Sequence, residues 1–384
     1  MRKPFNRVLP LTGVLGLVAL GLVAATAPAA ARNNDGGSPL TASLFATGGT
    51  GTPPRSKPDD ISAMGKAIFV AWQNGVGAQG EPSPTGNTDS TVVEYSRSGR
   101  ELASWNLTGR VDGMTADAAG GRVIATVNED GNTSLYTIRP EGPAGSQVTH
   151  YSYSPNPPPH GGGTDAPHMY RGQLFITASA PATNADGTQP LPGEPAVYRA
   201  TLTGTTATLA PVFYDDSMAT VANTNSPQYG RQTKLELTDP DSNTVVPGSS
   251  PRFGGDFMLD SQGDLQQVYA RNAGGPNQQL FVLNLSQSVD DTAWARASRG
   301  TLYITDGSQV WALTGRFTVG TAYSAVTPGN ANTLVPCSPP NPAPCPNYLA
   351  TLDLNTGVLT PVPGQTMTAK GLVFVSGERD GGGD

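Results

Sequence analysis

Short apolar runs alternate with polar turns along this chain, and one arrangement of them recurs about six times. In each copy an Asp or a small residue leads into a short apolar run, a Gly-containing turn follows, and a stronger apolar run comes next. The copies lie at residues 59–72, 112–125, 165–176, 256–269, 290–304 and 367–375, and the last one lacks the Asp. A single repeat of this kind is too small to bury its own apolar side chains. Such repeats therefore predict an array in which neighbouring copies stack on one another or close into a ring.

The repeats predict an all-β fold, namely a β-propeller with six blades, and seven blades are the alternative. Charged residues make up only 14% of the chain, while 47 Gly and 35 Pro supply turns between many short strands. We expect one propeller domain at residues 58–376 and a flexible tail at 377–384. Residues 218–222 and 234–237 fit the repeat poorly, and they predict either an inserted hairpin or a degenerate extra blade.

The last repeat leaves too few residues after it to complete a blade, so the ring needs a strand from elsewhere. Unpaired sheet edges favour aggregation, and a closed ring avoids them. We therefore expect residues 40–47, within the N-terminal segment 32–57, to form an outer strand that closes the ring.

The first 31 residues predict a secretory signal peptide. Arg2, Lys3 and Arg7 form a positive head, no further charge occurs before Arg32, and residues 29–31 form an Ala-Ala-Ala cleavage pattern. An uncleaved membrane anchor is the alternative, because the uncharged run is long enough to span a bilayer. We expect a secreted, extracellular, monomeric protein with no membrane span after cleavage.

Charge and cysteine content narrow the possible partners. Removing the signal peptide takes away three cations and no anions, which lowers the formal charge from −7 to −10. An acidic chain without a basic run is not expected to bind nucleic acid. Cys337 and Cys345 are the only cysteines, and in an exported protein such a pair predicts a disulfide across a Pro-rich loop.

The Asp residues of the repeats form the strongest candidate site: Asp59, Asp112, Asp165, Asp256 and Asp290. If each stands at the entry of an innermost strand, all five meet at the mouth of an axial channel. Crowded carboxylates raise one another's pKa or require a cation, and surroundings of oxygen alone favour Ca²⁺. Alternatively, each Asp accepts hydrogen bonds from its own turn and has no ligand role.

Other motifs carry less information. Residues 239–243 open like a calcium loop, but Thr244 and Ser250 replace the expected Gly and Glu, so we interpret them as a polar turn. Residues 75–80 match G-x-G-x-x-G, yet the Pro residues that follow preclude the helix a dinucleotide site needs. No catalytic residue is assigned apart from one weak candidate general base, His168, three residues after Asp165.

Residues 111–117 followed by 121–127 resemble the blade motif of NHL-repeat propellers, and they are similar to the gluconolactonase/regucalcin and paraoxonase group. The resemblance covers most of residues 58–376. It implies a divalent ion on the propeller axis, held by Asp, Asn and Glu side chains from several blades. The sequence departs from that group because its only Glu-Gly-Pro, at residues 141–143, is predicted in a turn between outer strands.

Two functions follow from these observations. The first is a non-catalytic binding module that recognises a small ligand or an extracellular protein at its channel face, with loops at 75–89, 154–164 and 328–346 shaping that face. The alternative is a Ca²⁺-dependent lactonase or esterase, in which an axial ion polarises a carbonyl and His168 assists. We favour the binding module, because few acid or base groups are expected near the axis. Calcium is the only cofactor that the sequence suggests.

Overall fold

The computed structural model describes residues 40–157, 163–179, 193–333, 335 and 345–377, which belong to one compact unit, Ser38–Asp384. Within these residues the chain is nearly all β-strand, with one short 3₁₀ helix at Pro328–Asn330. The all-β prediction is therefore confirmed. The predicted signal peptide, Cys337 and residues 378–384 lie outside the described residues, so the signal peptide and the disulfide stay predictions. No helix in the described part is long and apolar enough to cross a membrane.

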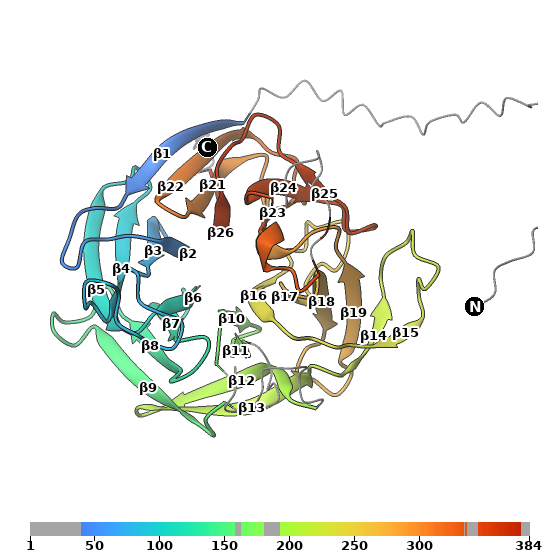
Figure 1. The fold of residues 1–384 in the computed structure, drawn as a ribbon, viewed down its shortest axis with the longest axis horizontal. Helices are drawn as coiled ribbons and strands as arrows, with labels where there is room; N and C mark the ends of the chain where they lie inside the picture. Colours follow the sequence, from blue (N-terminus) through green and yellow to red (C-terminus); the bar gives the residue numbers. More distant parts are fainter. Residues whose placement is uncertain (1–39, 158–162, 180–192, 334, 336–344, 378–384) are drawn as a thin grey trace, which may run out of the picture. The chain divides into compact units, whose positions relative to one another are not determined.

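Antiparallel groups of four strands stand around a central channel (Figure 1). From the channel outward, the first three groups are β2 (Pro58–Met64), β3 (Ala67–Trp72), β4 (Asp89–Ser96), β5 (Glu101–Thr108); β6 (Val111–Asp117), β7 (Arg122–Val127), β8 (Ser134–Ile138), β9 (Val148–Ser154); and β10 (Pro167–Tyr170), β11 (Gln173–Thr177), β12 (Pro195–Thr203), β13 (Thr206–Tyr214). β13 also runs parallel to β9, which joins the second and third groups at their outer edges into an eight-stranded sheet.

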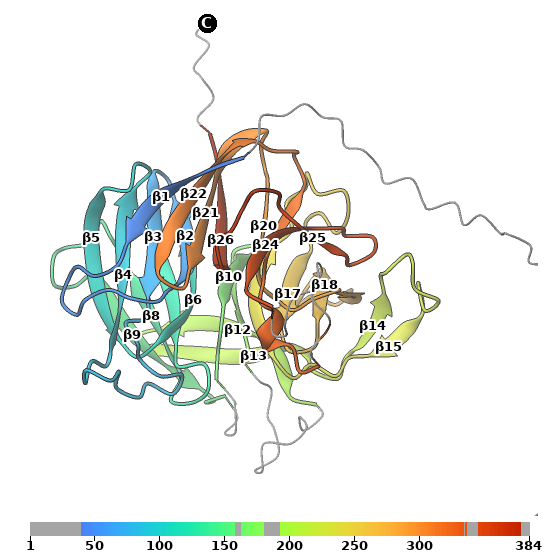
Figure 2. The same ribbon diagram turned by 45° about the horizontal axis from the view of Figure 1, so that its top comes forward.

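The next group differs from the prediction in which strand lies innermost. Its order from the channel is β16 (Pro240–Val245), β17 (Phe257–Ser261), β18 (Gln266–Arg271), β19 (Gln279–Asn284), and the hairpin of β14 (Met218–Val221) and β15 (Gln232–Lys234) extends the outer edge. Residues 256–259, expected to form the innermost strand of this group, therefore lie at the start of its second strand, β17. Residues 239–243, expected to form a polar turn, instead lie at the start of the innermost strand, β16. Figures 1 and 2 show the β14–β15 hairpin projecting outward, so this segment is an inserted hairpin.

The two remaining groups exchange chain segments. One is β20 (Val289–Trp294), β23 (Ala322–Val326), β24 (Tyr348–Leu352), β25 (Leu359–Pro361), and the last is β26 (Ala369–Ser376), β21 (Arg299–Asp306), β22 (Gln309–Arg316), β1 (Thr41–Thr47). The predicted pairing of 290–294 with 302–304 is wrong, because β20 pairs with β23 while β21 pairs with β22 and β26. Residues 367–375 contribute one strand where two were predicted.

The innermost strands contact one another in a closed cycle, from β2 through β6, β10, β16, β20 and β26 back to β2. This arrangement of sheets around one axis is a β-propeller. Apolar side chains pack between neighbouring sheets; Tyr170, Phe175 and Phe257, for example, form one aromatic cluster between the third and fourth groups. Trp72, Trp105 and Trp294 are buried in such clusters as well. The core therefore lies between sheets and leaves the axis open for polar residues.

Candidate functional site

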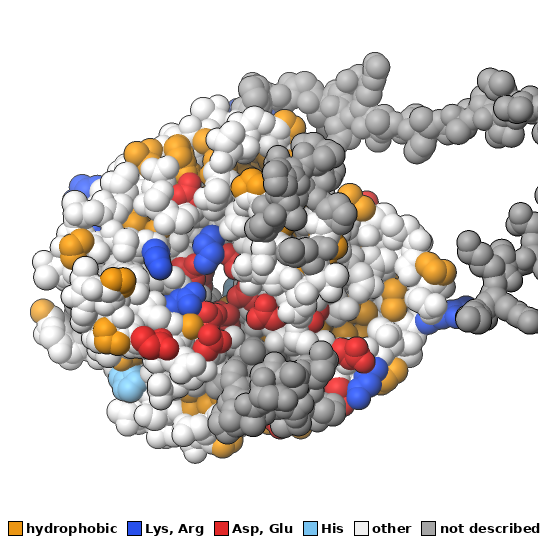
Figure 3. Space-filling model, in the orientation of Figure 1, with side chains coloured by type: hydrophobic (Ala, Val, Ile, Leu, Met, Phe, Trp, Pro, Cys, Tyr) orange, Lys and Arg blue, Asp and Glu red, His pale blue; other side chains and the backbone are white. Residues whose placement is uncertain are grey.

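The entry position of each innermost strand faces the channel. Its occupants form a set that we call the carboxylate ring: Asp59, Asp112, Asp165, Asp241, Asp290 and Lys370. The five Asp residues line one cavity of about 290 Å³. Figure 3 shows acidic side chains gathered around a central hollow, with several Lys or Arg side chains beside them. Strands from all around the axis thus contribute to one acidic site.

Four of the five predicted Asp residues meet in this ring, and Asp256 does not. Asp256 precedes β17, which runs antiparallel to β16 and therefore starts at the opposite end of the sheet. It forms an ion pair with Arg271 instead, at 3.3 Å. Asp241 occupies the place expected for Asp256, on the strand next to it. The Pro240-Asp241 dipeptide resembles Pro58-Asp59 at the start of β2, and this signal could have identified it.

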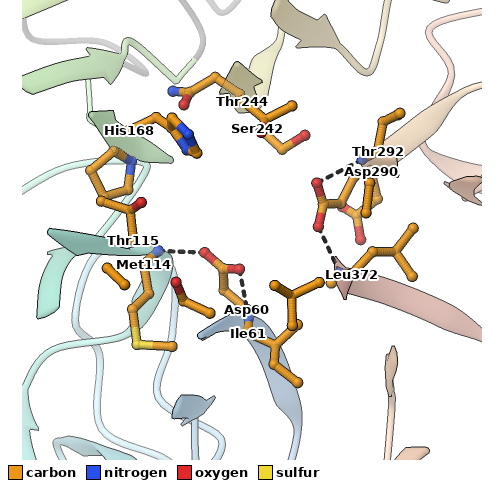
Figure 4. Close-up of a pocket in the computed structure, with 18 of the residues that line it drawn as sticks. Asp60, Ile61, Met114, Thr115, His168, Ser242, Thr244, Asp290, Thr292 and Leu372 are labelled. Carbon is orange, nitrogen blue, oxygen red and sulfur yellow. Dashed lines mark hydrogen bonds between the residues drawn. The ribbon is translucent and has the colours of Figure 1, made fainter. Parts of the chain in front are cut away.

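A β-bulge explains why two consecutive Asp residues of β2 face the cavity. The pairing of β2 with β3 shifts register between Pro58 and Ile61, and the extra residue of a bulge turns neighbouring side chains to one side. Asp60 accepts hydrogen bonds from the backbone N–H of Ile61, at 2.6 Å, and of Met114 on the next innermost strand (Figure 4). Asp60 therefore ties two adjacent sheets together.

Asp291 of β20 repeats this arrangement. β20 also shifts register beside its Asp pair, and Asp291 accepts hydrogen bonds from the N–H of Thr292 and of Leu372, both at 2.6 Å. At the equivalent position β6 and β26 carry Gly113 and Gly371, where an added Cβ would lie 2.4 Å from backbone atoms of the neighbouring innermost strand. On each of these four innermost strands, the residue that follows the ring residue therefore contacts a neighbouring sheet.

Burial and mutual repulsion raise the pKa values of four ring carboxyls: Asp112, Asp165, Asp241 and Asp290. Burial is the largest cause in each case, and it raises the pKa of Asp112, Asp165 and Asp241 well above the usual range and also raises that of Asp290. Burial likewise raises the pKa of Asp291 to about 7. Carboxyls in this state either keep protons or require a cation nearby.

The positive charges at the ring are distributed unevenly. Lys370 pairs with Asp59. Arg110 lies 2.7 Å from Asp112 and 2.9 Å from Glu129. Gln73 also donates to Asp59 and Asp112, at 2.8 and 3.2 Å. The side of the ring formed by these two Asp residues is therefore well supplied with cations and donors.

On the other side of the ring, Asp165 and Asp241 form no ion pair with any described Lys or Arg residue, and Asp290 is influenced by the charge of Lys370. The carboxyl of Asp241 lies close enough to those of Asp165 and Asp290 to change their pKa values, and Asp290 accepts a hydrogen bond from Gln262 at 2.7 Å. The Oδ2 atom of Asp241 is buried and has no hydrogen-bond partner within the described part of the chain. A buried polar atom without a partner is costly, so this sector is the place in the cavity best suited to a positively charged ligand.

Further along the innermost strands, the side chains of Thr115, Thr244 and His168 project into the cavity (Figure 4), which Arg296 also lines. Burial, followed by the charge of Arg296, lowers the pKa of His168 to about 4. The imidazole is therefore neutral and weakly basic at physiological pH, which does not suit the predicted role of general base.

The described residues contain no group of three or more His, Cys, Asp or Glu side chains placed to hold a metal ion. The calcium ligands expected from the sequence therefore stay a prediction. Carboxylate and hydroxyl oxygens are nonetheless the donors that hard cations prefer.

Comparison with known proteins gives no family assignment. No family model matches the chain, and no curated protein matches it. Among solved structures it is similar to a protein from Lactobacillus plantarum (TM-score 0.43, 10% identity, 88% of this chain and 100% of that one). It is also similar to a candidate 6-phosphogluconolactonase from Bacteroides uniformis (0.41, 12%, 88% and 100%), and to the WD40 propeller domain of Doa1 (0.39, 10%, 83% and 71%). Similarity this distant does not reveal a ligand or an activity, so the resemblance to NHL and gluconolactonase proteins stays a prediction.

Proposed function

We propose that this protein is an exported, non-catalytic binding module, built as a six-bladed propeller, whose channel cavity holds a small positively charged ligand. The observation that carries the proposal is the sector of Asp165, Asp241 and Asp290, where crowded carboxyls include a buried oxygen without a partner. A cation in this sector would supply the missing interaction and favour the ionised form of all three carboxyls.

The cycle of innermost strands supports a count of six blades, because each of these strands belongs to one group of four strands. The β14–β15 hairpin adds to the outer edge of an existing group and has no strand at the channel. We therefore count it as part of a blade, and the seven-bladed alternative is not needed.

Binding is favoured over catalysis by the surroundings of His168. A general base should have a pKa near the working pH and a partner that orients it, whereas burial and Arg296 lower the pKa of His168 and no carboxylate contributes to its environment. The carboxyls of Asp60 and Asp291 are occupied by backbone N–H groups.

Isothermal titration calorimetry at pH 7.5, on protein freed of metal with a chelator, tests this proposal with two probes: Ca²⁺ and 1,4-diaminobutane. At least one probe should bind the native protein, and Asp241→Asn should weaken that binding about tenfold to a hundredfold, as expected for a lost charge-assisted contact. Asp256→Asn is the matched control, since the same substitution lies away from the cavity, and it should leave the affinity unchanged.

The absence of heat with both probes, or full affinity in Asp241→Asn, would contradict the proposal. Hydrolysis of a lactone or aryl ester that requires Ca²⁺ and is lost in Asp241→Asn would instead establish the enzyme alternative.

A further inference from the structure

The cavity has a second charged region, far from the carboxylate ring. Arg296 lines the same cavity as Asp290 and follows it by six residues, which corresponds to roughly 20 Å along an extended strand. His168 follows Asp165 by three residues, or about 10 Å on the same scale. Acidic and basic groups therefore stand toward different ends of one cavity.

Arg296 and His168 line the same cavity from different sheets. His168 lies on β10, and Arg296 follows β20, so the group of β16 to β19 separates their sheets around the ring. Even so, the charge of Arg296 contributes to lowering the pKa of His168. The two side chains are thus neighbours only through the cavity that they both line.

Neither side chain has a carboxylate partner. Burial alone lowers the pKa of Arg296, and no carboxylate affects either group. Arg296 forms no ion pair or hydrogen bond with any described residue. Seven Asp side chains line this cavity among the described residues, yet none balances the guanidinium. Its described neighbours in the lining include the apolar residues Ala293, Trp294 and Phe374.

The chemistry of this pair suits an anion. A guanidinium offers a planar fork of donors that matches the oxygens of a carboxylate or phosphate. A neutral imidazole adds one N–H donor and brings no competing charge. Arg296 is exposed and His168 is half-buried, so a dissolved anion can reach both side chains from solvent.

We propose that Arg296 and His168 form an anion subsite that binds a carboxylate or phosphate group. If the proposed function of the carboxylate ring also holds, the natural ligand is amphoteric: its cationic part lies among Asp165, Asp241 and Asp290, and its anionic part lies at Arg296. The anion subsite itself does not depend on cation binding at the ring.

NMR of the imidazole resonances tests the subsite with inorganic phosphate as the probe and acetate as a second arm. Measurements at pH 5.5 increase the protonated fraction of Asp112, Asp165 and Asp241, whose pKa values burial raises, and this reduces their repulsion of the anion. The resonances of His168, assigned with His168→Gln, should shift saturably with phosphate, and the apparent pKa of His168 should rise by about one unit, as a nearby negative charge requires. Sodium chloride at equal ionic strength should not reproduce the shift, and His150, in an outer strand, should not move.

Arg296→Gln should abolish the saturable shift, whereas Arg231→Gln, on the exposed surface, should retain it. The urea midpoint of each variant shows whether it is folded. The proposal is overturned if neither anion moves His168 in the native protein, or if folded Arg296→Gln still responds. A response to acetate alone or to phosphate alone would identify which group the subsite accepts. Calorimetry with Asp241→Asn measures cation binding at the carboxylate ring, and NMR measures anion binding at His168. Either proposal can therefore fail without the other.

Discussion

Two Asp residues of the same blade, Asp241 and Asp256, have different roles in this protein. Asp241 begins an innermost strand and faces the cavity, whereas Asp256 pairs with Arg271 at the other end of the same sheet. An Asp before an apolar run marks the start of a strand, but it does not show which end of the sheet that strand starts from. The structure places Asp59, Asp112, Asp165 and Asp290 at the cavity, whereas Asp241 was missed because the first strand of its blade was mistaken for a turn.

The raised carboxyl pKa values predict an unusual dependence of stability on pH. Asp239 and Asp291 have pKa values of about 7 in the folded protein, raised chiefly by burial from an ordinary value of 3.8. Between these pH values the folded state binds more protons than the unfolded state, so stability should fall as pH rises. Each such group contributes at most on the order of 4 kcal/mol. His168 opposes this trend between pH 6.5 and about 4, but more carboxyls than imidazoles are shifted.

We therefore expect a higher urea midpoint at pH 5 than at pH 8 in the absence of cations. Asp241→Asn should stabilise the protein at pH 8, by about 1 kcal/mol, because it removes a destabilising charge at a site kept for binding. The gain should be smaller at pH 5, because burial raises the pKa of Asp241 and more of this carboxyl is protonated there. Asp256→Asn loses its ion pair with Arg271 and should give no such gain. Equal midpoints at both pH values would contradict this account.

At the scale of elements, Thr hydroxyls connect adjacent blades next to the carboxylate ring. Thr126 at the end of β7 donates to the carbonyl of Gly113 on its own innermost strand, at 3.2 Å, and to that of Asp165 on the next one, at 2.6 Å. Thr305 of β21 contacts the carbonyls of Gly371 and Asp59 in the same manner. These ties fix the spacing of the innermost strands and hence the spacing of the ring carboxyls.

Thr126→Val keeps the shape of this buried side chain and removes its hydroxyl. We expect the free energy of unfolding to fall by about 1–3 kcal/mol, because two buried carbonyls lose a donor. Urea unfolding measures the change. Thr208→Val on exposed β13 is the matched control and should change stability by less than about 0.5 kcal/mol. Similar losses in both variants would mean that the hydroxyl of Thr126 is not a tie between sheets.

Strand existence was easier to predict than strand pairing. Residues 112–125 gave the correct hairpin, because β6 and β7 are consecutive and the turn between them is short. Residues 290–304 gave an incorrect one, because the connection from β20 to β21 is equally short and the apolar runs look alike. The hydrophobic periodicity of a strand shows which of its sides is buried. It does not show which other strands bury it. The neighbours of β20 differ from those of β21, and the residues that decide this lie elsewhere in the chain.

At the scale of the whole molecule, the ring is completed by β1. This strand pairs with β22, and the ring of Phe45 packs edge-on against Tyr95 of the first blade and Tyr303 of the last. β1 therefore covers the outer edge of the last sheet and also bridges the two blades that meet where the ring closes.

Deleting residues 40–48 should lower the melting temperature by roughly 5–10 °C, since several kcal/mol of packing and strand pairing are lost. Phe45→Ala should reproduce part of this loss, and Leu44→Ala, on a side chain that is 53% exposed, should not. Differential scanning calorimetry compares the three variants with the native protein. An unchanged melting temperature after deletion would show that the edge of β22 does not need this strand.

The exchange of segments between the last two blades has a consequence for synthesis. β21 and β22 are made before β23, yet their innermost partner β26 begins only at Ala369. A nascent chain that has been translated as far as Leu352 still lacks the strand on which its sixth blade is built. Termination after β22 and before β25 should therefore yield a polypeptide with two unfinished blades rather than one, and the blade of β21 and β22 cannot be completed until β26 has been made.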